Sequence, residues 1–329
     1  MRAGFWIGAA LLCVLWTGPA AALASMNRER ADAVRETLNR GQADEALQKL
    51  DAALTANPND AEALNFRCRV FYAEERWDDA IGACERAVQI TPGNSDYHLW
   101  LGRAYGGKAQ QLNLMAAYKM AKLIRAEFEA AATLDPKNGP ALSDLGQFYA
   151  QAPAIVGGGY GKAEAVVRQV EPFSPVRALE LRAQIAEQKK DYDAAEKALR
   201  AKISASHSSA QSWMDLGSFY ERRQRWAEML AALQSGAIAA DRDHGPALAD
   251  GGAILMKSGR EPRMAIEWMR AYLRSNALSE EAPAFVVHAR VGTLLKQLGD
   301  TQAAQNEFDA ARDLAKDYAG LPDSRKPGH

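Results

Sequence analysis

Apolar side chains recur along this chain every three or four residues, in short stripes separated by turns. In the segment 61–90 one stripe contains Cys68 and the next contains Cys84, with a polar turn near Arg76 and Trp77 between them. A spacing of i, i+4, i+7 places side chains on one face of an α-helix. The segment therefore predicts two antiparallel helices joined by a short turn.

The same pattern returns at intervals of 34 residues. Pro58 and Pro92 are separated by this interval, and so are Gly217 and Gly251. One helix pair cannot bury its apolar face alone, so repeated pairs stack against one another. From about residue 27 to residue 316, the pattern predicts an all-α protein, an α-solenoid of about eight stacked antiparallel helix hairpins.

Some segments have a more specific signature. WMDLGSFY, LWLGRAYG and ALSDLGQFYA place Leu-Gly and then Tyr at fixed positions of a first helix, and DDAIGACERAVQITP supplies the small residues and the proline of a second helix. At these residues the chain resembles the tetratricopeptide repeat family, which implies that the α-solenoid is right-handed. The lengthened third unit and the loop PAIVGGG are similar to those of an uncharacterised subgroup of exported bacterial repeat proteins, and that likeness implies no activity.

The recurrent glycines predict close helix crossings, because two helices approach closely only where side chains are small. We expect Gly102, Gly146, Gly217 and Gly292 to lie where the second helix of the same unit crosses, opposite small residues such as Ala304. A leucine at such a position would overpack the pair.

Two insertions interrupt the period, near residues 106–123 and 152–162. The first has more apolar residues than one repeat needs, and it predicts either a lengthened helix pair with its own core or an exposed apolar edge for a partner. In the second, the glycines of residues 157–161 precede Lys162, as in a phosphate-binding loop. That motif requires Ser or Thr where Ala163 stands, and it follows a strand, so we predict no nucleotide binding.

The N-terminal residues 1–24 have the pattern of a secretory signal peptide. A positive charge precedes an apolar run from Phe5 to Trp16, and small residues follow, with cleavage expected between Ala24 and Ser25. The run is shorter than the ~20 residues that span a bilayer. We therefore expect a periplasmic or secreted protein with no integral membrane span after the signal peptide is removed.

Only two cysteines remain in the mature chain, Cys68 and Cys84. Each lies eight residues from Arg76, so a turn centred there would bring them to the same height on two inward-facing stripes. This geometry fits a disulfide, and it also fits two buried thiols in a tight helix crossing. Export to an oxidising compartment favours the bond.

Charge and composition exclude several classes of function. The 329 residues carry a net charge of −1, which argues against a nucleic-acid partner or an anionic-membrane surface. The five histidines do not stand at metal-ligand spacing, and neither C-x-x-C nor G-x-S-x-G occurs. We therefore predict no metal, no cofactor and no enzymatic activity. Residues 317–329, with Gly and Pro and mixed charge, predict a disordered tail.

The resemblance to tetratricopeptide repeats implies a concave surface lined by one face of the first helices. Transferred to this chain, that geometry gives the partner-binding candidates Asn65, Arg69, Tyr72, Leu99, Arg103, Ser143 and Gln147. Arg69 and Arg103, on neighbouring units, are placed to meet a carboxylate. The sequence thus favours a scaffold or adaptor of the cell envelope that presents a concave groove to a peptide or a partner helix. The alternatives are an envelope enzyme or enzyme subunit using the Gly-rich loop and the inserted helix, and a structural component of an envelope assembly.

Overall fold

The computed structural model describes residues 26–322, and in this range the chain forms sixteen α-helices and no strand. The helices follow one another as eight hairpins. The first helices of the hairpins are α1 (Arg28–Asn39), α3 (Ala61–Ala73), α5 (Ser95–Ala109), α7 (Gly139–Gln151), α9 (Pro175–Gln188), α11 (Ala210–Arg222), α13 (Ala247–Ser258) and α15 (Ala284–Gln297). The second helices are α2 (Ala43–Ala56), α4 (Trp77–Ile90), α6 (Leu114–Leu134), α8 (Tyr160–Val170), α10 (Tyr192–Ala205), α12 (Trp226–Asp243), α14 (Pro262–Arg274) and α16 (Thr301–Leu314), and a 3-10 helix, η1 (Ala154–Val156), lies between α7 and α8. The predicted α-solenoid of stacked helix hairpins is confirmed, whereas the predicted signal peptide and its cleavage site lie outside the described residues.

Asparagine and aspartate side chains begin several of the helices. Asp60 accepts a hydrogen bond from the N–H of Ala63 at 3.1 Å, and Asn138 accepts one from Ala141 at 3.0 Å. Such N-caps satisfy amide groups that have no partner inside the helix. Some of the first helices end where a residue just beyond them takes a positive φ, as at Glu75 with φ 60°. This left-handed residue turns the chain back into the second helix.

The glycines of the first helices mainly make room for large side chains. At Gly292 the backbone carbonyl of Ala304 also lies close, 3.1 Å from the position of an added Cβ, as the sequence led us to expect. A Cβ added to Gly102 would lie 2.5 Å from the ring of Phe128, on the second helix of the same hairpin. Gly146 differs, because its nearest side chain, Leu181, belongs to the next hairpin. The remaining two pairs are Gly217 with Leu233 and Gly292 with Phe308. At each of these glycines the missing side chain leaves space, and one large residue of a neighbouring helix fills it.

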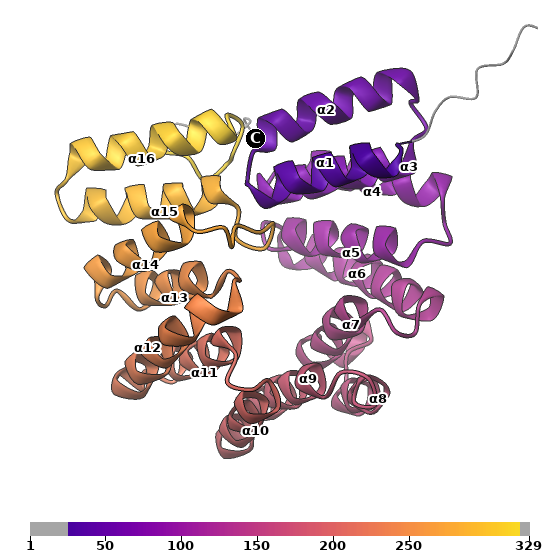
Figure 1. The fold of residues 1–329 in the computed structure, drawn as a ribbon. Helices are drawn as coiled ribbons and strands as arrows, with labels where there is room; N and C mark the ends of the chain where they lie inside the picture. The colour runs from indigo at the N-terminus through magenta and orange to yellow at the C-terminus, as the bar shows by residue number, and fades with distance from the viewer. Residues whose placement is uncertain (1–25, 323–329) are drawn as a thin grey trace, which may run out of the picture.

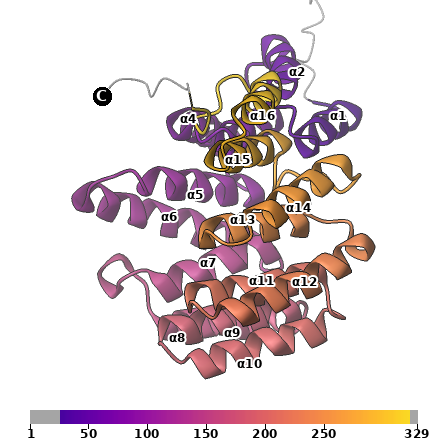
Figure 2. The ribbon, with the colours of Figure 1, turned by 90° about the vertical axis from the view of Figure 1, so that its left-hand side faces the viewer.

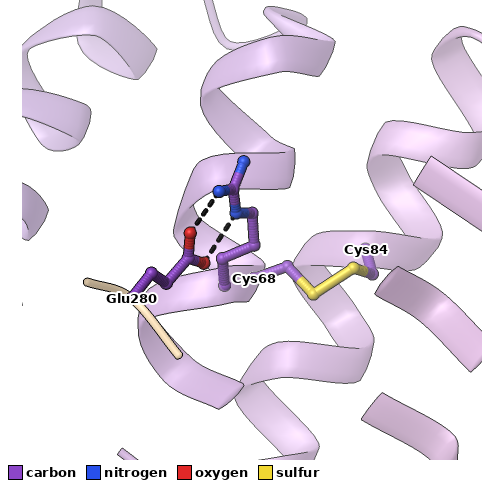
Figure 3. Close-up of a disulfide and its surroundings, with 4 residues drawn as sticks. Cys68, Cys84 and Glu280 are labelled. Carbon is purple, nitrogen blue, oxygen red and sulfur yellow. Dashed lines mark hydrogen bonds and ion pairs between the residues drawn. A yellow bond between two sulfur atoms is a disulfide. The ribbon is translucent and has the colours of Figure 1, made fainter. Parts of the chain in front are cut away.

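In the second hairpin, Cys68 and Cys84 stand at the positions that Gly102 and Phe128 occupy in the third hairpin. Cys68 stands 34 residues before Gly102, and Cys84 lies on α4 where α6 has Phe128. Their sulfur atoms lie 2.07 Å apart and their Cα atoms 5.3 Å apart, which is the geometry of a disulfide (Figure 3). Both residues are fully buried. A cystine therefore fills the space that a glycine and a phenylalanine fill in the next hairpin.

The first insertion lengthens the helices of the third hairpin, and the second lies between the two helices of the fourth. α6 is 21 residues long and begins at Leu114, and Ile124 and Phe128 on it are buried in the core. Leu114 and Met115, in its first turn, are exposed. The first insertion is thus both a lengthened helix pair and an exposed apolar edge. The second insertion forms η1.

The eight hairpins bend round until the last lies beside the first (Figure 1). α16 contacts α2, and a Cβ added to Gly41 would lie 2.3 Å from the backbone nitrogen of Ala284. Figure 2 shows α15 and α16 at the same end of the molecule as α1, α2 and α4. The solenoid therefore closes into a ring, with first helices packed against one another along its inner side. We call the closing contact, between residues 39–76 and residues 279–321, the seam.

Residues 317–321 belong to the seam, which corrects the disordered tail that the sequence predicts from residue 317 onward. Tyr318 and Leu321 are buried, and the ring of Tyr318 meets that of Phe285 edge-on with centres 5.0 Å apart. The N–H of Ala319 donates to the carbonyl of Glu74 at 3.1 Å. Burial of these apolar side chains holds the segment in place.

Candidate binding surface on the inner side of the ring

Arg69 on α3 and Glu280, in the segment before α15, join the two ends of the ring (Figure 3). The Nε of Arg69 donates to Glu280 Oε1 at 2.8 Å, and its Nη2 donates to Oε2. The two side chains are only 18% and 14% exposed. A bidentate guanidinium–carboxylate pair is stronger and more directional than a single hydrogen bond. This pair therefore ties the second hairpin to the segment that leads into the last one.

Glu74 is a fully buried acid in the seam. Its Oε2 lies 3.3 Å from Arg76 Nη1, and its Oε1 has no hydrogen-bond partner among the described residues. Burial raises the pKa of Glu74 to about 7, with Arg76 lowering it and the carboxylates of Asp44 and Asp317 raising it further. The seam therefore contains a carboxyl group that changes its charge near neutral pH.

A cluster of aromatic and arginine side chains lies on the inner side of α3 and α5. The guanidinium carbons of Arg69 and Arg103 lie 5.1 Å and 4.8 Å from the centre of the Trp100 ring. Tyr72 meets Trp100 edge-on at 5.6 Å. Arg103 also donates to Asp144, on α7, at 2.6 Å. We call Tyr72, Trp100 and Arg103 the tryptophan cluster; all three are partly exposed, so a partner segment can reach them.

Three of the seven predicted partner-binding residues are not available on the inner surface. Asn65 and Leu99 are buried, because neighbouring first helices pack against each other at these positions. Arg69 is engaged by Glu280. No local pattern indicated that pairing, since the two residues are 211 positions apart.

The other four lie on first helices and are at least partly exposed. Tyr72 and Arg103 belong to the tryptophan cluster, Ser143 accepts a hydrogen bond from Arg177 at 3.2 Å, and Gln147 is exposed. Sequence reasoning missed Trp100. The sequence did contain a signal for this residue. Trp100 directly follows Leu99, a predicted groove position, and a tryptophan has a large apolar surface that needs a contact.

Acidic side chains recur on three of the later first helices. Glu180, Asp215 and Asp250 stand 35 residues apart on α9, α11 and α13. The buried Lys202 donates to Glu180 at 2.7 Å and to Asp215 at 2.5 Å. Burial lowers the pKa of Lys202, but the two carboxylates outweigh this effect and raise the pKa above its ordinary value. Burial raises the pKa of Asp250 to about 6.

The Gly-rich loop is folded upon itself. The N–H groups of Gly157, Gly158 and Gly159 donate to carbonyls of the same turn or of α7, at 2.9, 3.2 and 2.8 Å. The Nζ of Lys162 donates to the carbonyl of Gly157 at 2.9 Å. An anion nest needs free amide groups, and these amides already have partners. The loop therefore gives no support to a phosphate site.

The histidines on the first helices make structural contacts. His98 uses Nδ1 toward Glu127 at 2.6 Å and Nε2 toward the carbonyl of Pro92 at 2.8 Å, and the hydrogen bond with Glu127 raises its pKa. His288 lies 2.7 Å from Glu307. Across residues 26–322, no group of three or more His, Cys, Asp or Glu side chains is placed to hold a metal ion.

None of the helices between residues 26 and 322 combines the length and the apolar character needed to cross a membrane.

The chain has the features of a helical repeat protein: repeated two-helix units, a 34-residue period and an inner side made of first helices. Proteins of this class bind other proteins through extended surfaces. Residues 31–95 match the family model described as tetratricopeptide repeat. That segment of the chain is therefore similar to tetratricopeptide repeats. No curated protein matches the chain.

Solved structures that are similar to this chain include the following three. TTC0263, a thermophilic tetratricopeptide repeat protein of Thermus thermophilus, is 21% identical, with 62% of this chain and 98% of that one covered at a TM-score of 0.47. A tetratricopeptide repeat protein of Parabacteroides merdae is 15% identical, with 79% and 97% covered at 0.46. The Cut9–Hcn1 structure of the APC/C is 13% identical, with 90% and 54% covered at 0.42.

Proposed function

We propose that this protein is an interaction scaffold of the cell envelope, which holds a peptide or a partner helix against the inner side of its ring. The tryptophan cluster carries the proposal. Tyrosine, tryptophan and arginine are the side chains that contribute most to binding at protein interfaces, and here they are held in place by Asp144 and by one another. A rigid surface of this kind loses little conformational entropy when a partner binds.

The proposed location rests on the N-terminal sequence pattern and on the buried cysteine pair. A cleaved signal peptide delivers the chain to a compartment where disulfides persist. Cys68 and Cys84 lie at bonding distance inside the second hairpin. Cell fractionation tests this directly, and recovery of the abundant species in the cytoplasm would contradict it.

Site-specific crosslinking in the native envelope tests the binding surface. A photoreactive amino acid replaces Gln147, which is exposed on α7 beside the tryptophan cluster, and in a matched control it replaces Gln302, exposed on α16. We expect a discrete protein adduct from the first position alone. Equal adducts from both positions, or an adduct from Gln302 alone, would place the partner elsewhere.

A charge reversal tests the role of Arg103 once that partner is identified. Arg103→Glu removes the cation from the tryptophan cluster and repels Asp144, and we expect affinity to fall at least about tenfold, which is ~1.4 kcal/mol. Arg182→Glu is the control, since Arg182 forms an exposed pair with Glu171 on the surface. Equal affinity of both variants would exclude Arg103 from the interface.

A further inference from the structure

Two turns of the ring end in aliphatic side chains that no part of the described chain covers. Leu114 and Met115, at the start of α6, are 85% and 72% exposed, and Ile155 in η1 is 74% exposed. Single exposed apolar residues are ordinary on a protein surface, but a group of them marks an interaction site. The third and fourth hairpins therefore have an unexplained apolar surface.

The two turns leave the ring on the same edge. Each joins the first helix of a hairpin to its second helix, and the two hairpins are neighbours in the stack. Figure 2 shows the turn before α6 and the segment between α7 and α8 projecting from one side. Arg125 of α6 donates to the carbonyl of Val156 at 3.4 Å, which ties η1 to α6. We call the surface formed by Leu114, Met115 and Ile155 the projecting edge.

Lysines lie near the projecting edge. Residues 97–126 contain five Lys and Arg and no Asp or Glu, and residues 151–163 contain one Lys and no acid. Three of these cations pair with acids outside the two ranges: Arg103 with Asp144, Lys108 with Asp78 and Arg125 with Glu129. Lys119 and Lys122 are exposed on α6 within about two turns of Met115. The net charge of −1 for the whole chain conceals this local excess, which is why the overall charge argued against an anionic surface as partner.

We propose that the projecting edge docks the ring onto an anionic phospholipid membrane, with Leu114, Met115 and Ile155 inserted among the headgroups. Lys119 and Lys122 then face the lipid phosphates. Apolar side chains next to cations are the combination that binds protein segments in the plane of an anionic bilayer. Tyr160, partly exposed at the start of α8, has the side chain that favours the boundary between headgroups and acyl chains.

The shape and charge of the projecting edge favour lipid over protein. A protein partner must offer a complementary surface of about 800 Å², and two narrow projecting turns present little area for it. A bilayer accepts side chains of any outline. A second copy of this chain would bring the same cations face to face, which repels.

Vesicle flotation tests the proposal on the chain from Ser25 onward, which contains all the described helices. The vesicles consist of phosphatidylcholine alone or with roughly a third of phosphatidylglycerol, which supplies the negative surface potential. The variant Leu114→Ser, Met115→Ser, Ile155→Ser removes the apolar contacts from exposed positions, so we expect its circular dichroism to match that of the parent chain. Ile238→Ser is the matched control, because Ile238 is 81% exposed on α12.

We expect the parent chain and the Ile238→Ser variant to bind the anionic vesicles and not the neutral ones. The triple variant should bind at least about tenfold more weakly. A second variant, Lys119→Gln with Lys122→Gln, should bind more weakly at low salt and lose most of the salt dependence. Absence of binding by the parent chain, or equal loss in the Ile238→Ser variant, would overturn the proposal.

Sedimentation of the parent chain and the triple variant separates the other occupants. Concentration-dependent association that only the triple variant loses would assign the projecting edge to a second copy of the chain. A protein crosslinked at Leu114 in the envelope, together with no vesicle binding, would assign it to a protein partner. Either result overturns membrane docking.

Discussion

Replacing Glu280 by alanine removes the carboxylate that holds Arg69 across the seam. The pair consists of two charge-assisted hydrogen bonds between side chains that are 18% and 14% exposed, and such bonds contribute about 1.5–3 kcal/mol each. Arg69 keeps its contacts with Phe66 and Trp100 in the variant and regains water, which offsets part of the loss. We therefore expect seam closure to weaken by about 2–3 kcal/mol, a factor of roughly 30–150 in the ratio of open to closed rings.

Spin labels at two exposed positions measure the opening. Gln48→Cys on α2 and Gln302→Cys on α16 place one label on each side of the seam. The parent chain should give one short, narrow distance distribution, and the Glu280→Ala variant should add a longer and broader component. Denaturant unfolding of the same samples gives the change in free energy.

Glu171→Ala is the matched control, because it removes an ion pair with Arg182 in which both side chains are more than two-fifths exposed. Such pairs contribute at most about 1 kcal/mol, so the distance between the labels should not change. If Glu280→Ala leaves both the distance distribution and the unfolding free energy unchanged, the Arg69–Glu280 pair does not hold the seam closed. A broad distribution in the parent chain would show that the seam does not close in solution.

Four further outcomes are expected. The pKa of Glu74 is about 7 in the fold against an ordinary 4.5, so between these two pH values the folded chain binds a proton that the unfolded chain does not. The free energy of unfolding should therefore fall by up to about 3 kcal/mol as the pH rises through this range. Glu74→Gln should remove this loss, as measured by denaturation series between about pH 5 and pH 8. If Cys68 and Cys84 form a disulfide, the mature, unreduced protein should be two hydrogen masses lighter than its reduced form. Cys84→Ser should lower the free energy of unfolding by about 3 kcal/mol. Two alkylatable thiols in freshly isolated protein would rule the disulfide out. Gly102→Ala should destabilise by about 1–3 kcal/mol, because the new Cβ would lie 2.5 Å from a phenylalanine ring, whereas Gly106→Ala on the same helix, with nothing within 4 Å, should stabilise slightly. N-terminal sequencing should find Ser25 first, and an intact leader on the abundant species would contradict export.

Local sequence determined the hairpins and much of the packing within them. Helix periodicity, the 34-residue interval and the glycines gave the architecture, because each unit interacts mainly with its neighbours in the chain. The approach of Cys68 and Cys84 followed from the same local geometry, since a turn at Arg76 brings equal distances along two helices side by side. The partners of the glycines were predicted less well, because a small residue indicates a close approach without saying which side chain makes it.

Only the tertiary structure decided how the ring closes and which groove residues remain accessible. The sequence predicted Arg69 as a partner-binding residue, but in the fold it contacts Glu280, and this contact joins positions 211 residues apart. Closure depends on the sum of small rotations between eight successive hairpins, and no short segment of the sequence records that sum. The burial of Tyr318 in the seam has the same origin, because a short segment beyond the last helix is ordered only when the first hairpins come round to cover it.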